Sequence, residues 1–399
     1  MGNISTPKIR FPDFKGEWIN NSLGEIAKFS KGKGISKEDI SETGETECIR
    51  YGELYTTYNE TIDTVFSKTN IDTSHLVLSE ANDVIIPASG ETEVDIAKAS
   101  CILKSGIALG GDLNIIKTLN NGVFLSYYLN SKKKIDIAKL AQGISVVHLY
   151  AGQLSKLQLK IPSLFEQQKI ASFFTAIDQK ISQLKRKKTL LEQYKKGVMQ
   201  KIFSQGIRFK DDNGQEYPKW KKMTGDALFE TVSNKNHNSD LPILAITQEH
   251  GAIPRDMIDY YITVSEQSVE SYKVVEKGDF IISLRSFQGG IEYSEYTGIC
   301  SPAYIILRAT QRIDHRYFKY YFKTDKYITD LNRKLEGIRD GKMISYKYFS
   351  EIEINVPSLP EQTKISNFLS AIDDKITHTQ NQIEKAEVWK KGLMQQMFV

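Results

Sequence analysis

The sequence IPSLFEQQKIASFFTAIDQKISQL at residues 161–184 returns as VPSLPEQTKISNFLSAIDDKITHT at residues 356–379. The likeness continues to EQYKKGVMQKIF in the first copy and EVWKKGLMQQMF in the second. Residues 161–204 and 356–399 align without a gap and are identical at 20 of 44 positions. Such a repeat shows how many structural units a chain contains. We therefore predict two half-molecules, each a long variable stretch followed by one copy of the repeat.

Each copy is expected to form one long helix that begins after a Pro-Ser turn. Apolar residues recur at heptad spacing, which is the pattern of a coiled-coil seam. A helix from Glu166 to Ser204 would be roughly 58 Å long at about 1.5 Å per residue, which suits a spacer rod. The predicted seam residues are Ile170, Phe174, Ile177, Ile181, Leu184, Leu191 and Val198 in the first copy, and Ile365, Leu369, Ile372, Ile376, Ile383 and Leu393 in the second.

Polar residues interrupt both seams. Lys188 and Lys195 occupy seam positions in the first copy, and Thr379 and Lys390 lie on the seam side of the second. Two interpretations remain open. Either another subunit or solvent meets the helices there, or the polar residues fix the register or the antiparallel orientation of the pair.

The variable stretches predict two mixed α/β (α+β) globular domains, at residues 1–160 and 206–355, with the helices at 161–205 and 356–399. Short β-rich runs such as Asp83-Val-Ile-Ile-Pro87 and Asp279-Phe-Ile-Ile-Ser283 alternate with glycine-containing turns. The two stretches also share an order of features. Ile9-Arg-Phe11 leading to Trp18 is matched by Ile207-Arg-Phe209 leading to Trp220, and FLSYYL at 124–129 by YFKYYF at 317–322. We expect a duplicated scaffold whose surfaces have diverged.

Composition indicates a globular protein. With 399 residues and 40% apolar content, about two to three domains are expected. No run of about 18 apolar residues could span a membrane, and the N-terminus lacks the apolar core of a secretion signal, so a cytoplasmic location is expected. Cys48, Cys101 and Cys300 form no CxxC pair, which supports neither a disulfide framework nor a zinc site. We expect three buried thiols.

Charge is unevenly distributed. Residues 160–222 carry 15 basic and 6 acidic residues, a balance of +9 that leaves −5 for the rest of the chain. A basic middle favours a polyanion or an acidic partner. The stretch Lys185-Arg-Lys-Lys188 with Lys195-Lys196 could contact DNA, meet a partner protein, or form the solvated back of the helices.

The motifs of several enzyme classes are missing. An amine methyltransferase would carry an Asn/Asp-Pro-Pro-Tyr/Phe element, but none of the ten prolines is followed by another. No glycine cluster has the GxGxxG spacing, and Gly341-Lys342 is followed by Met343 rather than Ser or Thr. The six histidines form no HExxH or other metal-ligand spacing. The sequence therefore predicts a recognition or scaffolding protein without catalytic or metal-binding residues.

Three elements occur in both repeats: the Pro-Ser-Leu-x-Glu-Gln-x-Lys-Ile opening, the Ala-Ile-Asp-x-Lys-Ile core and the Lys-Lys-Gly-x-Met-Gln ending. On these elements the chain resembles the DNA-specificity subunit of type I restriction-modification enzymes over essentially its whole length. The resemblance implies two target-recognition domains separated by two long antiparallel coiled-coil helices, with an internal pseudo-two-fold duplication.

The resemblance also implies a division of labour. Each target-recognition domain would read one half of a bipartite site on double-stranded DNA. Two modification subunits would supply S-adenosylmethionine and N6-adenine methylation, and two restriction subunits would supply ATP-driven and Mg-dependent motor and nuclease activity. This chain would bind no cofactor. The rival hypotheses are an enzyme with its own cutting or methylating activity, which the missing motifs disfavour, and a structural coiled-coil adaptor, which leaves the globular domains without a purpose.

Loops of the two domains supply the candidate DNA contacts. Arg or Lys suits guanine, Asn or Gln suits adenine, and phosphates accept Lys, Arg, Ser and Thr. The candidates in the first domain are Lys31, Lys33, Arg50, Tyr51, Ser89, Glu91, Gln142 and Ser145. Those in the second domain are Gln248, His250, Arg285, Ser286, Gln288, Arg339 and Lys342. For each residue the alternative is an exposed polar side chain or a contact that stabilises its own loop.

Overall fold

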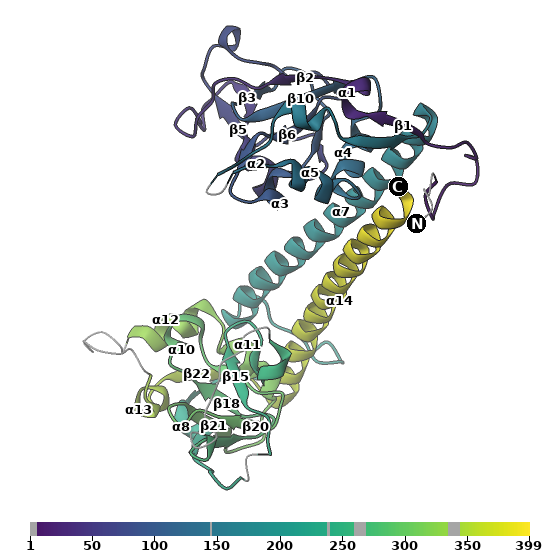
Figure 1. Ribbon diagram of the computed structural model, residues 1–399. Helices are drawn as coiled ribbons and strands as arrows, with labels where there is room; N and C mark the ends of the chain where they lie inside the picture. Colours follow the sequence, from purple (N-terminus) through teal and green to yellow (C-terminus); the bar gives the residue numbers. More distant parts are fainter. Residues whose placement is uncertain (1–5, 144–145, 238–239, 259–268, 334–343) are drawn as a thin grey trace. The chain divides into compact units, whose positions relative to one another are not determined.

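The computed structural model (Figure 1) describes residues 6–143, 146–237, 240–258, 269–333 and 344–399. The chain forms two compact units. Unit 1 comprises Met1–Arg186 with Gln380–Val399, and unit 2 comprises Lys187–Thr379. The predicted mixed α+β class is confirmed. The division of the chain differs from the predicted domain boundaries, because it falls inside the long helices and gives each unit one half of each helix.

The two repeats form the long helices α7 (Leu164–Phe203) and α14 (Leu359–Met397), teal and yellow in Figure 1. At the start of α7 the Ser163 hydroxyl accepts a hydrogen bond from the Glu166 amide at 3.4 Å, and the Ser163 carbonyl accepts one from the Gln167 amide at 3.0 Å. In α14 Pro360 lies in the first turn, where an amide has no partner within the helix. The sequence thus sets where both helices begin.

Within each unit the halves of the two helices run antiparallel. In unit 1 the seam residues Ile170, Phe174, Ile177 and Ile181 of α7 share a core with Leu393 and Met397 near the end of α14. In unit 2 the order is reversed, and Ile365, Leu369, Ile372 and Ile376 of α14 share a core with Val198 and Ile202 of α7. Of the other predicted seam residues, Leu184 and Ile383 are buried and Leu191 is half-buried.

The globular part of unit 1 is built around a five-stranded sheet of order β2-β10-β6-β8-β4, antiparallel except between β8 and β4. Its strands are β2 (Ala27–Lys31), β10 (Leu113–Thr118), β6 (Val84–Pro87), β8 (Ser100–Ile102) and β4 (Thr61–Ile62). A three-stranded sheet joins β5 (Ser67–Thr69), β3 (Thr46–Ile49) and β9 (Ala108–Leu109), and two pairs join β1 (Ile19–Ser22) to β12 (Gln158–Ile161) and β7 (Ser89–Gly90) to β11 (Val147–His148). The helices are α1 (Leu23–Ile26), α2 (Tyr51–Thr56), α3 (Glu93–Ile96), α4 (Gly122–Asn130), α5 (Lys134–Leu140) and α6 (Ala151–Leu154), with a 3-10 turn at Thr73–His75.

Unit 2 repeats this plan with a four-stranded sheet of order β14-β21-β18-β19. Its strands are β14 (Phe229–Val232), β21 (Ile305–Ala309), β18 (Phe280–Ile282) and β19 (Glu292–Tyr293). Three antiparallel pairs join β13 (Lys221–Thr224) to β22 (Glu353–Val356), β15 (Leu244–Thr247) to β16 (Gly251–Pro254), and β17 (Lys273–Val275) to β20 (Gly298–Cys300). The helices are α8 (Gly225–Leu228), α10 (Ser286–Gly289), α11 (His315–Tyr321), α12 (Asp325–Arg333) and α13 (Tyr346–Ser350), with a 3-10 turn at Arg255–Met257.

Each globular part is fastened to its helices by the same contacts. Arg10 donates two hydrogen bonds of 2.7 Å to the buried carboxylate of Glu166. Arg208 donates to the equally buried Glu361 at 3.2 and 2.8 Å. The rings of Phe11 and Phe173 lie 5.6 Å apart in unit 1, and those of Phe209 and Phe368 lie 5.4 Å apart in unit 2. The parallel between the Ile-Arg-Phe segments therefore has a physical cause, which is a shared anchor on the first three turns of the two helices.

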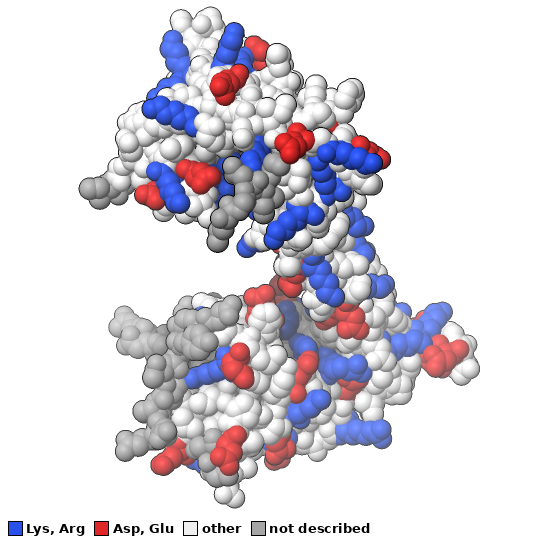
Figure 2. Space-filling view, turned by 45° about the vertical axis from the view of Figure 1, so that its right-hand side comes forward, with Lys and Arg blue, Asp and Glu red and all other residues white. Residues whose placement is uncertain are grey.

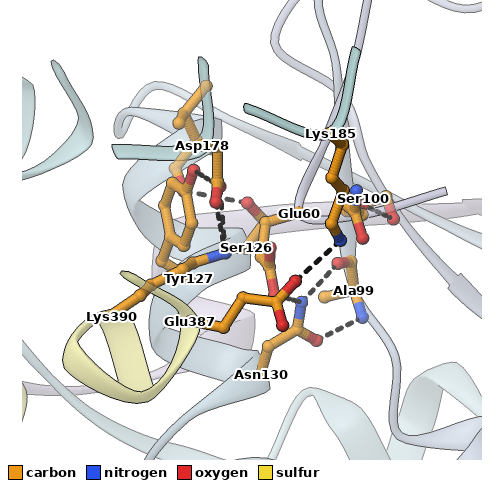
Figure 3. Close-up of polar contacts among 12 residues, drawn as sticks. Glu60, Ala99, Ser100, Ser126, Tyr127, Asn130, Asp178, Lys185, Glu387 and Lys390 are labelled. Carbon is orange, nitrogen blue, oxygen red and sulfur yellow. Dashed lines mark hydrogen bonds and ion pairs between the residues drawn. The ribbon is translucent and has the colours of Figure 1, made fainter. Parts of the chain in front are cut away.

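A second shared contact joins the helices to each other and to the globular part. In unit 1 the Tyr127 hydroxyl donates to Asp178 of α7, which is also ion-paired with Lys390 of α14 at 2.7 Å (Figure 3). In unit 2 Tyr320 donates to Asp373 of α14 at 2.6 Å, and Asp373 is paired with Lys195 of α7 at 2.6 Å. Lys195 and Lys390 thus bind across the helix pair, which favours the interpretation that polar seam positions fix its orientation.

The cysteines agree with a further expectation. Cys48, Cys101 and Cys300 are free and buried. Burial raises the pKa of the Cys48 thiol to about 11 and those of Cys101 and Cys300 to about 12. Among the described residues, no helix is long and apolar enough to cross a membrane.

Candidate nucleic-acid interface

The first group of candidate DNA contacts in unit 1 surrounds the turn between β9 and β10. Lys31 and Lys33 are exposed, and the Lys33 amide donates to the Leu109 carbonyl at 2.9 Å. Arg50 caps the start of α2 through its backbone, since its amide donates to the Glu53 carboxylate at 2.7 Å. The Arg50 Nε atom is buried without a hydrogen bond. Tyr51 is half-buried against the core beside α2.

The second group in unit 1 lies where β7 pairs with β11. Ser89 is 5% exposed, so its hydroxyl does not lie on the outer surface, although its backbone is in register with the exposed His148. Glu91 and Gln142 are exposed, and the Gln142 backbone exchanges two hydrogen bonds with His148. Ser145 lies outside the described residues. The pairing therefore brings Gln142 to the same edge as the loop after β6.

The two groups come together at α2. Burial raises the pKa of Tyr55, and the nearby Tyr51 and Glu91 raise it further. Tyr51 belongs to the first group and Glu91 to the second. One residue of each group thus acts on the same tyrosine of α2.

In unit 2 the candidates converge on the β15–β16 turn and the start of α10. Gln248 is exposed, and its amide nitrogen donates to the Arg285 carbonyl at 3.3 Å. His250 is also exposed, and its backbone amide donates to the Thr247 hydroxyl at 2.9 Å. A Cβ atom on Gly289 would come within 2.7 Å of Gln248 Cδ, so a larger residue there would require the exposed Gln248 side chain to move.

Arg285 and Gln288 are exposed next to Gln248, but Ser286 is fully buried and its hydroxyl accepts from the Ser283 amide at 2.9 Å. Ser286 therefore stabilises its own turn. For this residue the structure favours the alternative to a DNA contact, which was a contact that stabilises its own loop. Arg339 and Lys342 lie outside the described residues.

Two exposed aromatic side chains at the β7–β11 edge of unit 1 are absent from the candidates predicted from the sequence. His148 and Tyr150 are exposed and stack with ring centroids 6.2 Å apart. Between and beside them Val147 and Leu149 are buried. The alternation of buried and exposed residues over 147–150 is the pattern of a half-buried strand, and it could have identified both rings. Exposed aromatic rings are able to stack on bases.

The electrostatic character of the surface is mixed. On the face drawn in Figure 2, Lys and Arg side chains are interspersed with Asp and Glu over both units. Within the part of the chain that the structure describes, no group of three or more His, Cys, Asp or Glu residues could hold a metal ion. The candidate interface thus offers hydrogen-bond donors, hydrogen-bond acceptors and aromatic rings on loops. This suits recognition of base edges more than binding to the phosphate backbone through charge alone.

Comparison with known proteins agrees with this architecture. Residues 15–193 and 221–388 match the family described as type I restriction modification DNA specificity domain. A putative type I restriction enzyme MjaX specificity subunit from Methanocaldococcus jannaschii is 24% identical, with 97% of this chain and 86% of the relative covered. The MjaVIII specificity subunit of the same organism is 23% identical, with 97% and 92% covered.

A solved structure shares the fold. The crystal structure of a type I restriction-modification S subunit from M. genitalium is 17% identical, has a TM-score of 0.61, and is matched over 99% of both chains. The family match covers most of this chain, in two segments that follow the order of the internal repeat. The chain therefore belongs to the family of type I restriction-modification DNA-specificity subunits.

Proposed function

We propose that the chain reads a bipartite site on double-stranded DNA, one half-site with each globular part, and positions two modification subunits and two restriction subunits on it. The observation that carries this proposal is the contrast between duplicated anchors and diverged loops. Arg10 and Arg208, with Glu166 and Glu361, fasten the two parts in the same way. The loops after the matching Asp-x-Ile-Ile strands have diverged, because unit 1 has a buried Ser89 where unit 2 has an exposed Arg285, so each part suits a different target.

In this function the chain is not an enzyme by itself. Its role is to place loops against base edges, while S-adenosylmethionine, ATP and Mg²⁺ are held by the partner subunits. The two helices would set the spacing of the half-sites, because a pseudo-symmetric protein meets DNA at sites about one helical turn apart, roughly 34–36 Å, or a multiple of it.

Co-expression with a modification subunit and mapping of N6-methyladenine across the host genome tests the proposal. We expect an asymmetric bipartite motif with an unspecified spacer. Methylation by this chain alone would show that it is an enzyme, and a continuous motif would show that the two parts do not read separate half-sites.

A helix insertion tests the role of α7 and α14. Four residues added after Lys187, with a matching insertion after Gln382 at the same position of the second repeat, add about 6 Å to each helix. We expect a longer unspecified spacer with both half-sites unchanged. Altered half-sites would contradict the spacer role.

A further inference from the structure

Unit 2 contains a cleft where its globular part meets the helices. The cleft has a volume of about 860 Å³. Its walls come from α7, α14, the β15–β16 hairpin, β19 and the adjoining ends of α11 and α12. Gln248 and His250 of the candidate DNA-reading loop lie on its rim. A ligand in the cleft would therefore touch both the helices and that loop.

The corresponding junction in unit 1 is fastened by an extra carboxylate. There Lys390 lies between Asp178 at 2.7 Å and Glu60 at 2.9 Å (Figure 3). In unit 2 the matching Lys195 pairs with Asp373, and among the described residues no second carboxylate lies within ion-pair distance of it. Lys195 lines the cleft instead.

The charges of the cleft disfavour nucleic acid. Six carboxylates and four lysines line it, and three of these lysines are already ion-paired at 2.6 to 2.7 Å. The six carboxylates are Glu192, Glu249, Glu292, Glu295, Asp325 and Asp373. A phosphate backbone would meet this excess of negative charge and would be repelled.

One of these carboxylates lacks part of its hydrogen bonding. Glu292 is 1% exposed, its Oε1 atom accepts from Lys323 at 2.6 Å, and its buried Oε2 atom has no partner. A buried carboxylate oxygen without a donor is costly, and a basic side chain would supply that donor. The cleft also has apolar lining, including Met199, Met257 and Ile376, of which Met257 is 59% exposed. Flexible methionines adapt to the side chains of a bound peptide.

We propose that this cleft binds a polypeptide segment of the modification subunit. The segment carries a basic side chain that is directed at Glu292, and apolar side chains flank this basic side chain. The partner's identity rests on the proposed function. The segment would lie against the loop that holds Gln248 and His250. In this way the modification subunit would contact the loop that reads the second half-site.

Thiol labelling tests the proposal. Thr377 is exposed on α14 and lines the cleft, and Ser182 is its exposed counterpart in the first repeat, in unit 1. The three native cysteines are buried with raised pKa values, so they react slowly with maleimide at neutral pH. Thr377→Cys and Ser182→Cys are labelled in the free chain, with target duplex, and in complex with the modification subunit.

We expect the complex to slow labelling of the Thr377→Cys variant by about tenfold or more, because packed interface cores exclude solvent. The duplex alone should leave its labelling unchanged, and the Ser182→Cys variant should label at a similar rate in all three samples. Unchanged labelling of Thr377→Cys in the complex would overturn the proposal, as would protection by the duplex alone or equal protection at both positions.

A charge variant gives an independent readout. Glu292→Gln keeps the side-chain shape but removes the charge, and should weaken binding of the modification subunit by about tenfold or more. Glu295→Gln, at the exposed pair with Lys319, is the matched control and should change binding little. Thermal unfolding of each free variant checks that it is folded. Unaltered binding by Glu292→Gln would overturn the proposal. A different result would contradict the proposed function, namely that the wild-type complex does not methylate a bipartite site.

Discussion

In unit 1 the helices meet the globular part at a charge cluster in which Glu60 and Asp178 enclose Lys390. In unit 2 the corresponding Lys195 binds Asp373 and borders the cleft. The anchors that attach each part are the same in kind, whereas the surfaces beside them differ. Duplication has thus kept the residues that hold the parts on the helices, and divergence has acted on what those parts present to other molecules.

The largest expected effect tests whether the anchors are equivalent. Glu166→Ala and Glu361→Ala each leave a partly buried arginine without its carboxylate, which typically costs about 3–5 kcal/mol of unfolding free energy. Denaturant unfolding with hydrogen exchange resolved for each unit measures both. We expect similar losses, each confined to the unit that carries the substitution.

The double variant Arg10→Ala/Glu166→Ala is the control. It should be less destabilised than the sum of its single variants, because removing both partners leaves no unpaired charge. A loss below about 1 kcal/mol for Glu166→Ala would show that the anchor does not hold unit 1 together.

A smaller effect should distinguish the two junctions by the direction in which their stability changes with pH. Burial alone would raise the pKa of Glu60, but Lys390 and Lys98 outweigh it and lower that pKa. The Glu60 carboxylate therefore stabilises unit 1 above its unfolded pKa of about 4.3. This stability is lost as the pH falls through the lower folded value. Glu60→Gln should cost about 1–3 kcal/mol at pH 7 and progressively less toward pH 4.

Glu292 should behave in the opposite way. Burial raises its pKa more than Lys323 lowers it. Its contribution to stability is therefore most favourable below the unfolded pKa of about 4.3 and declines as the pH rises through the folded value. Glu292→Gln should cost unit 2 less at pH 7 than Glu60→Gln costs unit 1. Hydrogen exchange of each unit at pH 7 and pH 5 measures the difference, and an equal loss at pH 7 would contradict it.

Equivalent loop positions should differ in DNA recognition. Arg285 and Ser89 stand at matching places after the Asp-x-Ile-Ile strands, yet Arg285 is exposed and Ser89 is buried. Arg285→Ala should weaken target binding by about 1–3 kcal/mol and relax one base position if it reads guanine. Ser89→Ala should leave the other half-site unchanged. Binding to duplexes altered one base pair at a time checks both, and a uniform loss over all sequences would assign Arg285 to phosphate instead.

Much of the fold was predictable because its signals are local. The heptad spacing and the Pro-Ser turns predicted both long helices, and the α7 and α14 bounds lie within a few residues of them. The Ile-Arg-Phe parallel predicted a duplicated feature, and the anchor on Glu166 and Glu361 explains it. The unit boundaries inside the helices were not predictable in this way, because they depend on antiparallel pairing between residues far apart in the sequence.

The candidate site was less predictable, because exposure depends on tertiary packing. Ser89 and Ser286 have the composition of loop contacts, but both are buried, and the Ser286 hydroxyl accepts from the Ser283 amide within its own turn. His148 and Tyr150 show the reverse case, since they lie in a short β-type alternation and are exposed. The pairing of Lys195 with Asp373 could not be predicted from the basic stretch. The sequence alone does not distinguish a lysine that forms an ion pair across the helices from one that is solvated.

The smallest expected effect concerns that basic stretch. Lys185 forms a 2.7 Å ion pair with Glu387, and their side chains are 59% and 47% exposed. Exposed pairs contribute little, so Lys185→Ala should cost no more than about 1 kcal/mol of unfolding free energy. Because Glu387 already neutralises this lysine, we also expect the salt dependence of DNA binding to stay the same. A salt slope reduced by about 1 would instead show that Lys185 leaves Glu387 for a phosphate when DNA binds.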